Sequence, residues 1–195
     1  MRALVVFCHP CEESYNAAIG SAVLHALERA GHDVQYVDLY KEEFDPVMGA
    51  HERRLYHEPG KNEDPIRDQV AQILWSEMLV FVYPTWWYGL PAMLKGWLDR
   101  VWVPHVTFEM PDENQPMRSK MQHIKKIAVV TTCGATWWLS KLVGEPGKKT
   151  IIRGIRLLCA KNCRTMYLAL YKMDTCSSQQ RQQYLEKVER KLAKF

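Results

Sequence analysis

Residues 83–102 read Tyr83-Pro84-Thr85-Trp86-Trp87-Tyr88-Gly89-Leu90-Pro91-Ala92-Met93-Leu94-Lys95-Gly96-Trp97-Leu98-Asp99-Arg100-Val101-Trp102. The apolar run at 78–83 predicts a buried strand, and Pro91 suits the first turn of a helix that we expect over 91–102. The loop between them carries three consecutive aromatic residues, Trp86, Trp87 and Tyr88. The sequence therefore predicts a strand–loop–helix unit whose loop presents large flat side chains.

Strand and helix patterns alternate along the rest of the chain. Apolar runs of strand length are typical of strands buried on both faces of a parallel sheet, and we expect them at 3–8, 34–39, 78–83, 127–132 and 165–171. Helical spacing and helix-start signals predict helices at 14–30, 64–74, 91–102, 148–159 and 178–192, with polar excursions at 45–63 (with a short helix at 49–56) and 103–120. The alternation predicts a doubly wound α/β fold of three layers around five parallel strands.

Length and composition favour an ordinary globular protein. The 195 residues fit one domain over 1–195, and 47% of them are hydrophobic. The net charge of +4 gives little reason to expect a nucleic-acid partner. The longest apolar runs are far shorter than the roughly 20 residues of a membrane span, and the N-terminus lacks signal-peptide features. We therefore expect a cytoplasmic protein with no membrane span.

Six cysteines occupy positions 8, 11, 133, 159, 163 and 176. The pairs Cys8/Cys11 and Cys159/Cys163 could be read as halves of a zinc site. Each pair also has a local explanation, at a strand end and at a helix-to-strand junction. The histidines show no metal-ligand spacing, so we expect reduced thiols and no metal.

Three loops follow predicted strands, and ligands bind at the carboxyl ends of strands in an open parallel sheet. The first loop leads to Ser14, which can cap a helix whose N-terminus suits a phosphate, and His9 can add a donor. The second loop is the aromatic one, and the third contains small residues at 131–134 that let a ligand approach closely. Each loop taken alone also has a simpler explanation. The first can be an ordinary helix cap, the aromatic residues of the second can belong to the core or to an interface, and the third can be an ordinary turn. Together the loops favour a phosphate-bearing ligand with a flat apolar ring, as in flavin.

These segments resemble the NAD(P)H:quinone oxidoreductase family of flavodoxin-like flavoproteins. The matching segments are His9 to Asn16, 84–97 and 131–134, in the same order and spacing, over roughly residues 1–170. The resemblance implies that the first loop holds the flavin phosphates and that the other two cradle the isoalloxazine. The residues implicated are His9, Ser14, Tyr15, Asn16, Pro84, Thr85, Trp86, Trp87, Tyr88, Thr131, Thr132, Cys133 and Gly134. An aromatic residue and an amide at 15 and 16 favour FAD over FMN.

The resemblance implies an NAD(P)H dehydrogenase (quinone) type enzyme that takes hydride from NAD(P)H and passes two electrons to a quinone-like acceptor. It also implies a homodimer, for which tryptophans at 86–102 and 137–138 would be anchors. Larger animal members carry a Tyr and a His after the fourth strand, and residues 137–147 contain neither. Cys133 replaces a family glycine. No catalytic residue is therefore assigned, and the protein's own role is to orient the flavin.

Two other functions stay open at this point. One is an ancillary flavin-binding subunit of a potassium-efflux system, and the other is a flavodoxin-type electron carrier, a class that is usually strongly acidic. Lys149, Arg153 and Arg156 are expected on one helix face. That face is either solvated or a contact for the extra phosphate of NADPH or for a partner.

Overall fold

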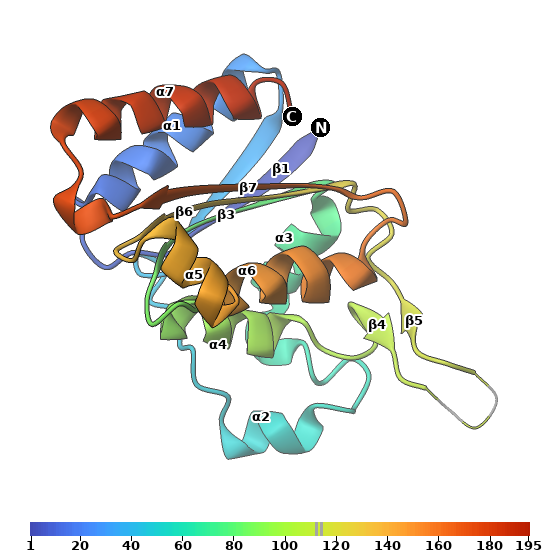
Figure 1. Cartoon of the computed structure of the whole chain (residues 1–195). Helices are drawn as coiled ribbons and strands as arrows, with labels where there is room; N and C mark the ends of the chain where they lie inside the picture. The colour runs from blue at the N-terminus through green and yellow to red at the C-terminus, as the bar shows by residue number, and fades with distance from the viewer. Residues whose placement is uncertain (112, 114) are drawn as a thin grey trace.

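The computed structural model describes residues 1–111, 113 and 115–195. A five-stranded parallel sheet runs through it in the order β2-β1-β3-β6-β7 (Figure 1). Its strands are β1 (Arg2–Phe7), β2 (Asp33–Asp38), β3 (Met78–Thr85), β6 (Lys126–Cys133) and β7 (Arg164–Tyr171). This is the doubly wound, flavodoxin-like strand order, so the predicted fold class is confirmed.

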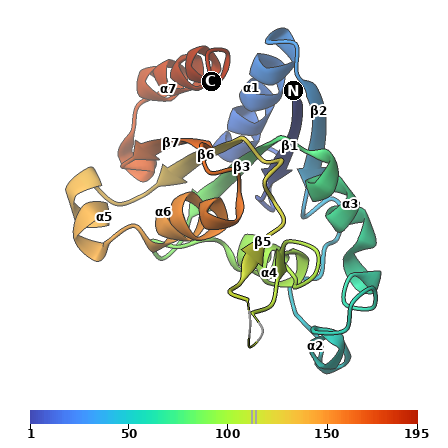
Figure 2. The same cartoon turned by 90° about the vertical axis from the view of Figure 1, so that its right-hand side faces the viewer.

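Helices cover both faces of the sheet. Helices α1 (Tyr15–Arg29) and α7 (Ser178–Leu192) lie side by side on one face, and α3 (Arg67–Trp75), α4 (Ala92–Val101) and α6 (Pro146–Lys149) cover the other (Figures 1 and 2). Alternate strand residues enter two separate apolar clusters, so that on β1 Leu4 faces one cluster and Val5 the other. The three-layer arrangement follows from strands that are apolar on both faces. No helix among the described residues is long and apolar enough to cross a bilayer.

The helix starts expected from the sequence are mostly present. Ser14 Oγ accepts from the Ala17 N–H at 3.2 Å at the start of α1, and Gly31 follows its end with φ of +75°. Asp64 does not cap the next helix. It begins a 3₁₀ turn (Asp64–Ile66) ahead of α3, and its side chain pairs with Arg67.

Two helical segments differ from the prediction. The helix expected over 148–159 is α6 followed by a π-helical turn (Thr150–Gly154) and a 3₁₀ turn (Ile155–Leu158). Helix α5 (Trp137–Val143), at the margin of the molecule in Figure 2, was not predicted. Most of its apolar side chains are exposed, so it has no buried stripe that sequence periodicity could reveal. Leu74, the last residue of the helix expected over 64–74, is 47% exposed.

Both excursions contain short elements. Helix α2 (Ala50–Leu55) lies within the predicted 49–56 and projects away from the sheet (Figure 1). The excursion at 103–120 contains an antiparallel pair, β4 (Phe108–Glu109) and β5 (Arg118–Ser119). A 3₁₀ turn (Met173–Thr175) lies between β7 and α7.

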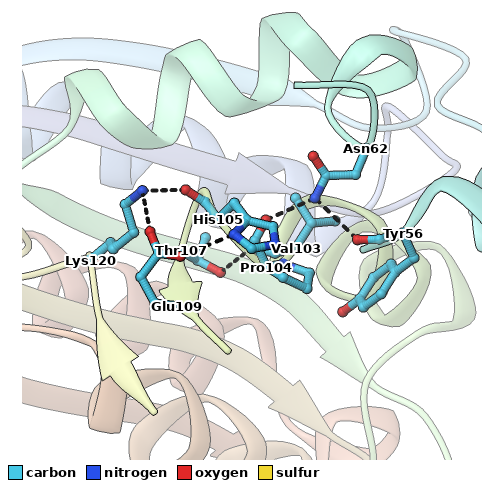
Figure 3. A network of polar contacts seen from close by, with 8 residues as sticks. All are labelled: Tyr56, Asn62, Val103, Pro104, His105, Thr107, Glu109 and Lys120. Carbon is cyan, nitrogen blue, oxygen red and sulfur yellow. Dashed lines mark hydrogen bonds and ion pairs between the residues drawn. The ribbon is translucent and has the colours of Figure 1, made fainter. Parts of the chain in front are cut away.

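A polar network fixes the two excursions to each other (Figure 3). Asn62 Nδ2 donates to the Pro104 carbonyl at 2.8 Å, although Asn62 is only 2% exposed. Glu109 accepts from Lys120 at 2.8 Å and lies 3.0 Å from His105 Nδ1. These bonds join the two excursions and add to the apolar contacts that Val103, Val106 and Tyr56 make with the core.

Candidate functional site

The three loops expected at one sheet edge are in direct contact there. Asn16 Nδ2 donates to Thr132 Oγ1 at 3.1 Å and joins the first loop to the third. The hydroxyls of Thr85 and Thr131 lie 3.0 Å apart and join the second loop to the third. The ring centroids of His9 and Trp86 lie 6.3 Å apart, which places the first loop next to the second.

The first loop presents donors at the N-terminus of α1. Ser14 caps the helix, whose first-turn N–H groups and dipole favour an anion. His9 Nδ1 accepts from the Cys11 N–H at 3.0 Å. The same Nδ1 lies 3.2 Å from the Cys11 carbonyl oxygen, so both of these contacts hold the ring within its own loop, and Nε2 is the ring nitrogen that remains for a ligand.

Tyr15 and Asn16 have different surroundings. The Tyr15 hydroxyl donates to the Arg181 carbonyl at 2.6 Å and ties α1 to α7, and burial raises the pKa of Tyr15 to about 12. The Tyr15 hydroxyl is thus used inside the protein. Asn16 is 5% exposed, and its Oδ1 has no hydrogen-bond partner among the described residues. A buried acceptor of this kind is costly unless a ligand supplies a donor.

The aromatic loop is a tight turn with two residues in the left-handed region. The Gly89 N–H donates to the Trp86 carbonyl at 2.9 Å, and Trp87 and Tyr88 have φ of 47° and 61°. Turns of this type normally use Gly, Asn or Asp at these positions, and each aromatic residue costs roughly 1–2 kcal/mol there. Trp87 is 95% and Trp86 43% exposed, so neither is a core residue. Strain combined with exposure is typical of a site that meets a ligand or partner.

The third loop is buried and closely packed. Thr131 and Thr132 are 0% and 4% exposed, and Cys133 is buried beside Ser140. A Cβ at Gly134 would lie 2.5 Å from Asp174 Oδ2, so a larger residue does not fit without displacing Asp174. Pro84, the last of the thirteen residues taken from the resemblance, is buried in β3 opposite Thr132.

A small cavity beside the second and third loops was missed by sequence reasoning. It is lined by Thr85, Tyr88, Cys133, Ser140, Glu145, Lys148, Tyr167 and Tyr171. The Glu145 carboxylate accepts from Tyr171 at 3.1 Å, from Lys148 at 3.1 Å and from Lys141 at 2.6 Å. Burial alone would raise the pKa of Glu145, but these bonds lower it below its usual value.

Tyr171 could have been found from the sequence, because it ends β7 at the same sheet edge as the other loops. Glu145 and Lys148 gave no comparable signal. They follow the unpredicted α5, and Glu145 has φ of 49°, a backbone conformation that no motif in its sequence indicates.

The tryptophans expected as interface anchors fall into two groups. Trp97 and Trp102 are 0% and 7% exposed and belong to the core, so they cannot anchor a partner. Trp86 and Trp87 on the aromatic turn are exposed, and Trp137 and Trp138 are each 60% exposed on α5. The described residues contain no group of three or more His, Cys, Asp or Glu side chains that could hold a metal ion.

The residues at this edge fit a flavin. The ligand would need hydroxyl groups for Asn16 Oδ1, a phosphate for the start of α1 and a flat ring for the exposed aromatic turn. Flavin nucleotides carry all three. At this edge of the sheet, the open, strained aromatic turn and the unpartnered amide oxygen of Asn16 are two features that the protein's own interactions leave unexplained.

The fold and its edge define a flavodoxin-like α/β protein. The family described as having a flavodoxin-like fold matches residues 1–192, and the chain belongs to it. The expected resemblance to NAD(P)H:quinone oxidoreductases is confirmed by relatives with such names. NAD(P)H dehydrogenase [quinone] 1 of Cavia porcellus is 29% identical over 170 residues, which cover 77% of this chain and 60% of the relative. An uncharacterized NAD(P)H oxidoreductase of Escherichia coli is 35% identical over 102 residues, covering 52% of each chain.

Solved structures agree with this family. NAD(P)H:quinone oxidoreductase from Methanothermobacter marburgensis is 25% identical with a TM-score of 0.84, covering 99% of this chain and 96% of its own. Smu.1420 of Streptococcus mutans is 27% identical with a TM-score of 0.86, and the match covers 100% of both chains. The matches cover 44–60% of the length of the curated relatives.

Proposed function

We propose that this protein is a flavin-dependent NAD(P)H oxidoreductase that passes two electrons by hydride transfer to quinones or similar acceptors. The observation that carries the proposal is that three loops at the strand ends contact one another, and that one of them is an exposed, strained aromatic turn. The names of the relatives, NAD(P)H dehydrogenase [quinone] and NAD(P)H:quinone oxidoreductase, support the same activity.

Each loop has a distinct role in this proposal. The start of α1 and His9 bind the flavin phosphate, and Asn16 Oδ1 accepts from a flavin hydroxyl. The loop with Trp87 and Tyr88 covers the ring and excludes water from one of its faces, and Thr85 and Thr131 hold this loop against β6. The flavin, when bound, supplies the hydride acceptor, and the protein supplies binding and orientation.

We propose a single flavin-binding domain over residues 1–195 with FAD as its preferred flavin. One sheet with an apolar cluster on each face supports the single domain. The aromatic Tyr15 and the amide Asn16, next to the phosphate-binding helix start, support FAD over FMN. Heat release of the flavin followed by chromatography tests this preference, and recovery of FMN alone would contradict it.

We also propose a homodimer in a reducing compartment such as the cytoplasm. Exposed apolar side chains gather on α5 and the aromatic turn, among them Trp86, Trp137, Trp138 and Leu142. Exposed apolar patches of this kind mark interaction sites. All six cysteines are free thiols, as in reducing compartments. A monomer in sedimentation velocity at micromolar concentration, with flavin bound, would contradict the dimer.

The central test is a flavin titration followed by turnover. We expect purified protein to be yellow, or to become so with added FAD, and to oxidise NAD(P)H when a simple benzoquinone is present. Protein that gains no flavin spectrum would refute the flavin site. Protein that binds flavin and shows no turnover would refute the enzyme and leave a binding subunit.

A further inference from the structure

A positively charged hollow lies at the junction of α5 and α6. It is lined by Lys141, Gly144, Glu145, Lys148, Lys149, Ile152 and Arg153. We call these residues the basic hollow. Four basic side chains face one carboxylate there, so the hollow favours an anion.

The single carboxylate neutralises only part of this charge. Glu145 pairs with Lys141 at 2.6 Å and with Lys148 at 3.1 Å. No ion pair joins Lys149 or Arg153 to a carboxylate within the described part of the chain, and both are exposed. Two cationic side chains are thus available to a ligand with two negative charges.

The hollow adjoins the flavin loops. It shares Glu145 and Lys148 with the cavity lined by Thr85, Tyr88 and Cys133. A dinucleotide whose nicotinamide lies against those loops has its phosphates and adenosine end available to the neighbouring hollow. The two cavities are therefore neighbours that share part of their lining.

The chemistry of the hollow favours a terminal phosphate over a pyrophosphate. Backbone N–H groups at helix N-termini commonly hold pyrophosphates, but here the N–H groups of Gly144 and Glu145 both donate to the Ser140 carbonyl at 3.1 Å. Side chains provide the remaining donors, and Arg and Lys together suit a phosphate dianion. The 2′-phosphate of NADPH is such a group, and NADH lacks it.

Three basic residues, Lys149, Arg153 and Arg156, were expected on one helix face, and in the structure they do not all face the basic hollow. Arg156 Nε donates to the Cys163 carbonyl at 3.1 Å and Nη2 to the Lys161 carbonyl at 3.4 Å, so its guanidinium is committed elsewhere. Arg153 lies in the π-helical turn Thr150–Gly154, a type of turn that is frequent at functional sites. Lys149 and Arg153 remain as the pair that faces the hollow.

We propose that the basic hollow binds the 2′-phosphate of NADPH and makes the protein select NADPH over NADH. This inference rests on the proposed oxidation of NAD(P)H. It assigns the selectivity to Lys149 and Arg153, two residues outside the flavin-binding loops.

Steady-state kinetics with both dinucleotides test the selectivity. We expect the wild type to have a KM for NADPH about tenfold below that for NADH, as one or two charge-assisted hydrogen bonds provide. Lys149→Gln and Arg153→Gln should each raise the KM for NADPH severalfold, with kcat and the KM for NADH unchanged. Arg190→Gln, on α7 across the sheet, is the control and should change neither KM. Equal KM values in the wild type, or variants that raise both KM values alike, would overturn the inference.

A binding measurement separates this inference from the proposed function. Calorimetric titration with adenosine 2′,5′-bisphosphate and with 5′-AMP requires no turnover. Preferential binding of the bisphosphate, lost in Arg153→Gln, supports the hollow even in protein that oxidises neither dinucleotide, where only the proposed function would fail. Equal binding of both nucleotides, in protein that oxidises NADH and NADPH alike, would refute the hollow and leave the oxidoreductase intact.

Discussion

Asn16 donates through Nδ2 to Thr132 Oγ1 at 3.1 Å, although 116 residues separate them in the chain. The bond lies in the buried region between the start of α1 and the end of β6. It fixes the first and third loops relative to each other by contacts within the protein. Asn16 Oδ1 is left without a partner among the described residues. The same side chain therefore holds the edge together and offers a buried acceptor.

Thr132→Val should lower stability and weaken flavin binding together. The substitution keeps the shape of the side chain but leaves Asn16 Nδ2 without its acceptor, at a cost of about 1–3 kcal/mol for a buried group. Urea unfolding and fluorescence titration with FAD measure the two effects. Thr165→Val on β7, at an exposed position, is the matched control. If both variants behaved alike, the bond would not organise the edge.

Trp87→Ala should reduce flavin retention and turnover much more than Cys133→Ala or His123→Ala. Trp87 is 95% exposed, so its truncation removes little packing from the free protein but removes the surface offered to the ring. Stacking between two aromatic ring systems contributes about 0.5–1.5 kcal/mol beyond the effect of the area that it buries. His123 Nε2 contacts the Ile73 carbonyl at 3.1 Å, ahead of β6 and far from its carboxyl end. Full activity in Trp87→Ala with loss in Cys133→Ala would indicate a thiol-based site instead.

Trp87→Gly should make the free protein more stable while it weakens flavin binding. Glycine relieves the left-handed strain at φ of 47°. The relief of about 1–2 kcal/mol exceeds the entropic cost of glycine, about 0.5–1 kcal/mol. Trp87→Ala keeps the strain and is the comparison. Thermal unfolding of the flavin-free variants should rank glycine above alanine, and the reverse order would show that the turn is not strained.

Much of the fold could be predicted because its signals are local. Ser14 caps its helix, and the fully apolar run at 78–83 is buried as expected, since both depend on neighbouring residues alone. Helix α5 escaped prediction because Trp137, Trp138 and other apolar residues on it are exposed. Its stability comes from the Thr136 cap and from Gly144 with φ of 94°, which are short signals.

The sequence predicted only the part of the site that follows from one rule, namely that ligands bind at the carboxyl ends of the strands in a parallel sheet. That rule places the three loops at one edge, where the structure brings them into contact. The Tyr171–Glu145 bond of 3.1 Å spans 26 residues and depends on how α5 turns back toward β7. The hydrophobic periodicity of the sequence does not indicate that the chain turns back in this way. Lys149 and Arg153 of the basic hollow were expected on one helix face, but nothing in the sequence indicated that Lys141, which precedes that turn, lines the same hollow.

Glu52→Gln should destabilise the protein by about 3 kcal/mol, because it leaves a buried charge without its partner. Arg100 Nε lies 2.9 Å from Glu52, with side-chain exposures of 10% and 11%, and the pair joins α4 to α2. The matched control is Asp99→Asn, whose pair with Lys95 is half exposed and contributes at most about 0.5 kcal/mol. Urea unfolding measures both. Equal effects would mean that α2 does not depend on the buried pair.

Glu145→Gln should remove a pH-dependent part of the stability. Bonds from Lys141, Lys148 and Tyr171 hold the pKa of this carboxyl below its ordinary value of 4.5 in the folded protein, although burial acts in the opposite direction. The unfolded chain binds a proton at that ordinary value, so the stabilisation is fully present at higher pH and is lost as pH falls through the lower, folded-state pKa. The wild type should exceed the variant by about 1 kcal/mol near neutral pH.

This difference in the free energy of unfolding should shrink as urea titrations are repeated from neutral pH down through the ordinary carboxyl pKa of 4.5 and on toward the lowered pKa of the folded protein. Glu58→Gln, at an exposed position on the surface, should give no such trend. A difference that stays constant across this range would show that the carboxylate is not stabilised by its three donors. Glu145 would then not offset the charges of Lys141 and Lys148 in the basic hollow.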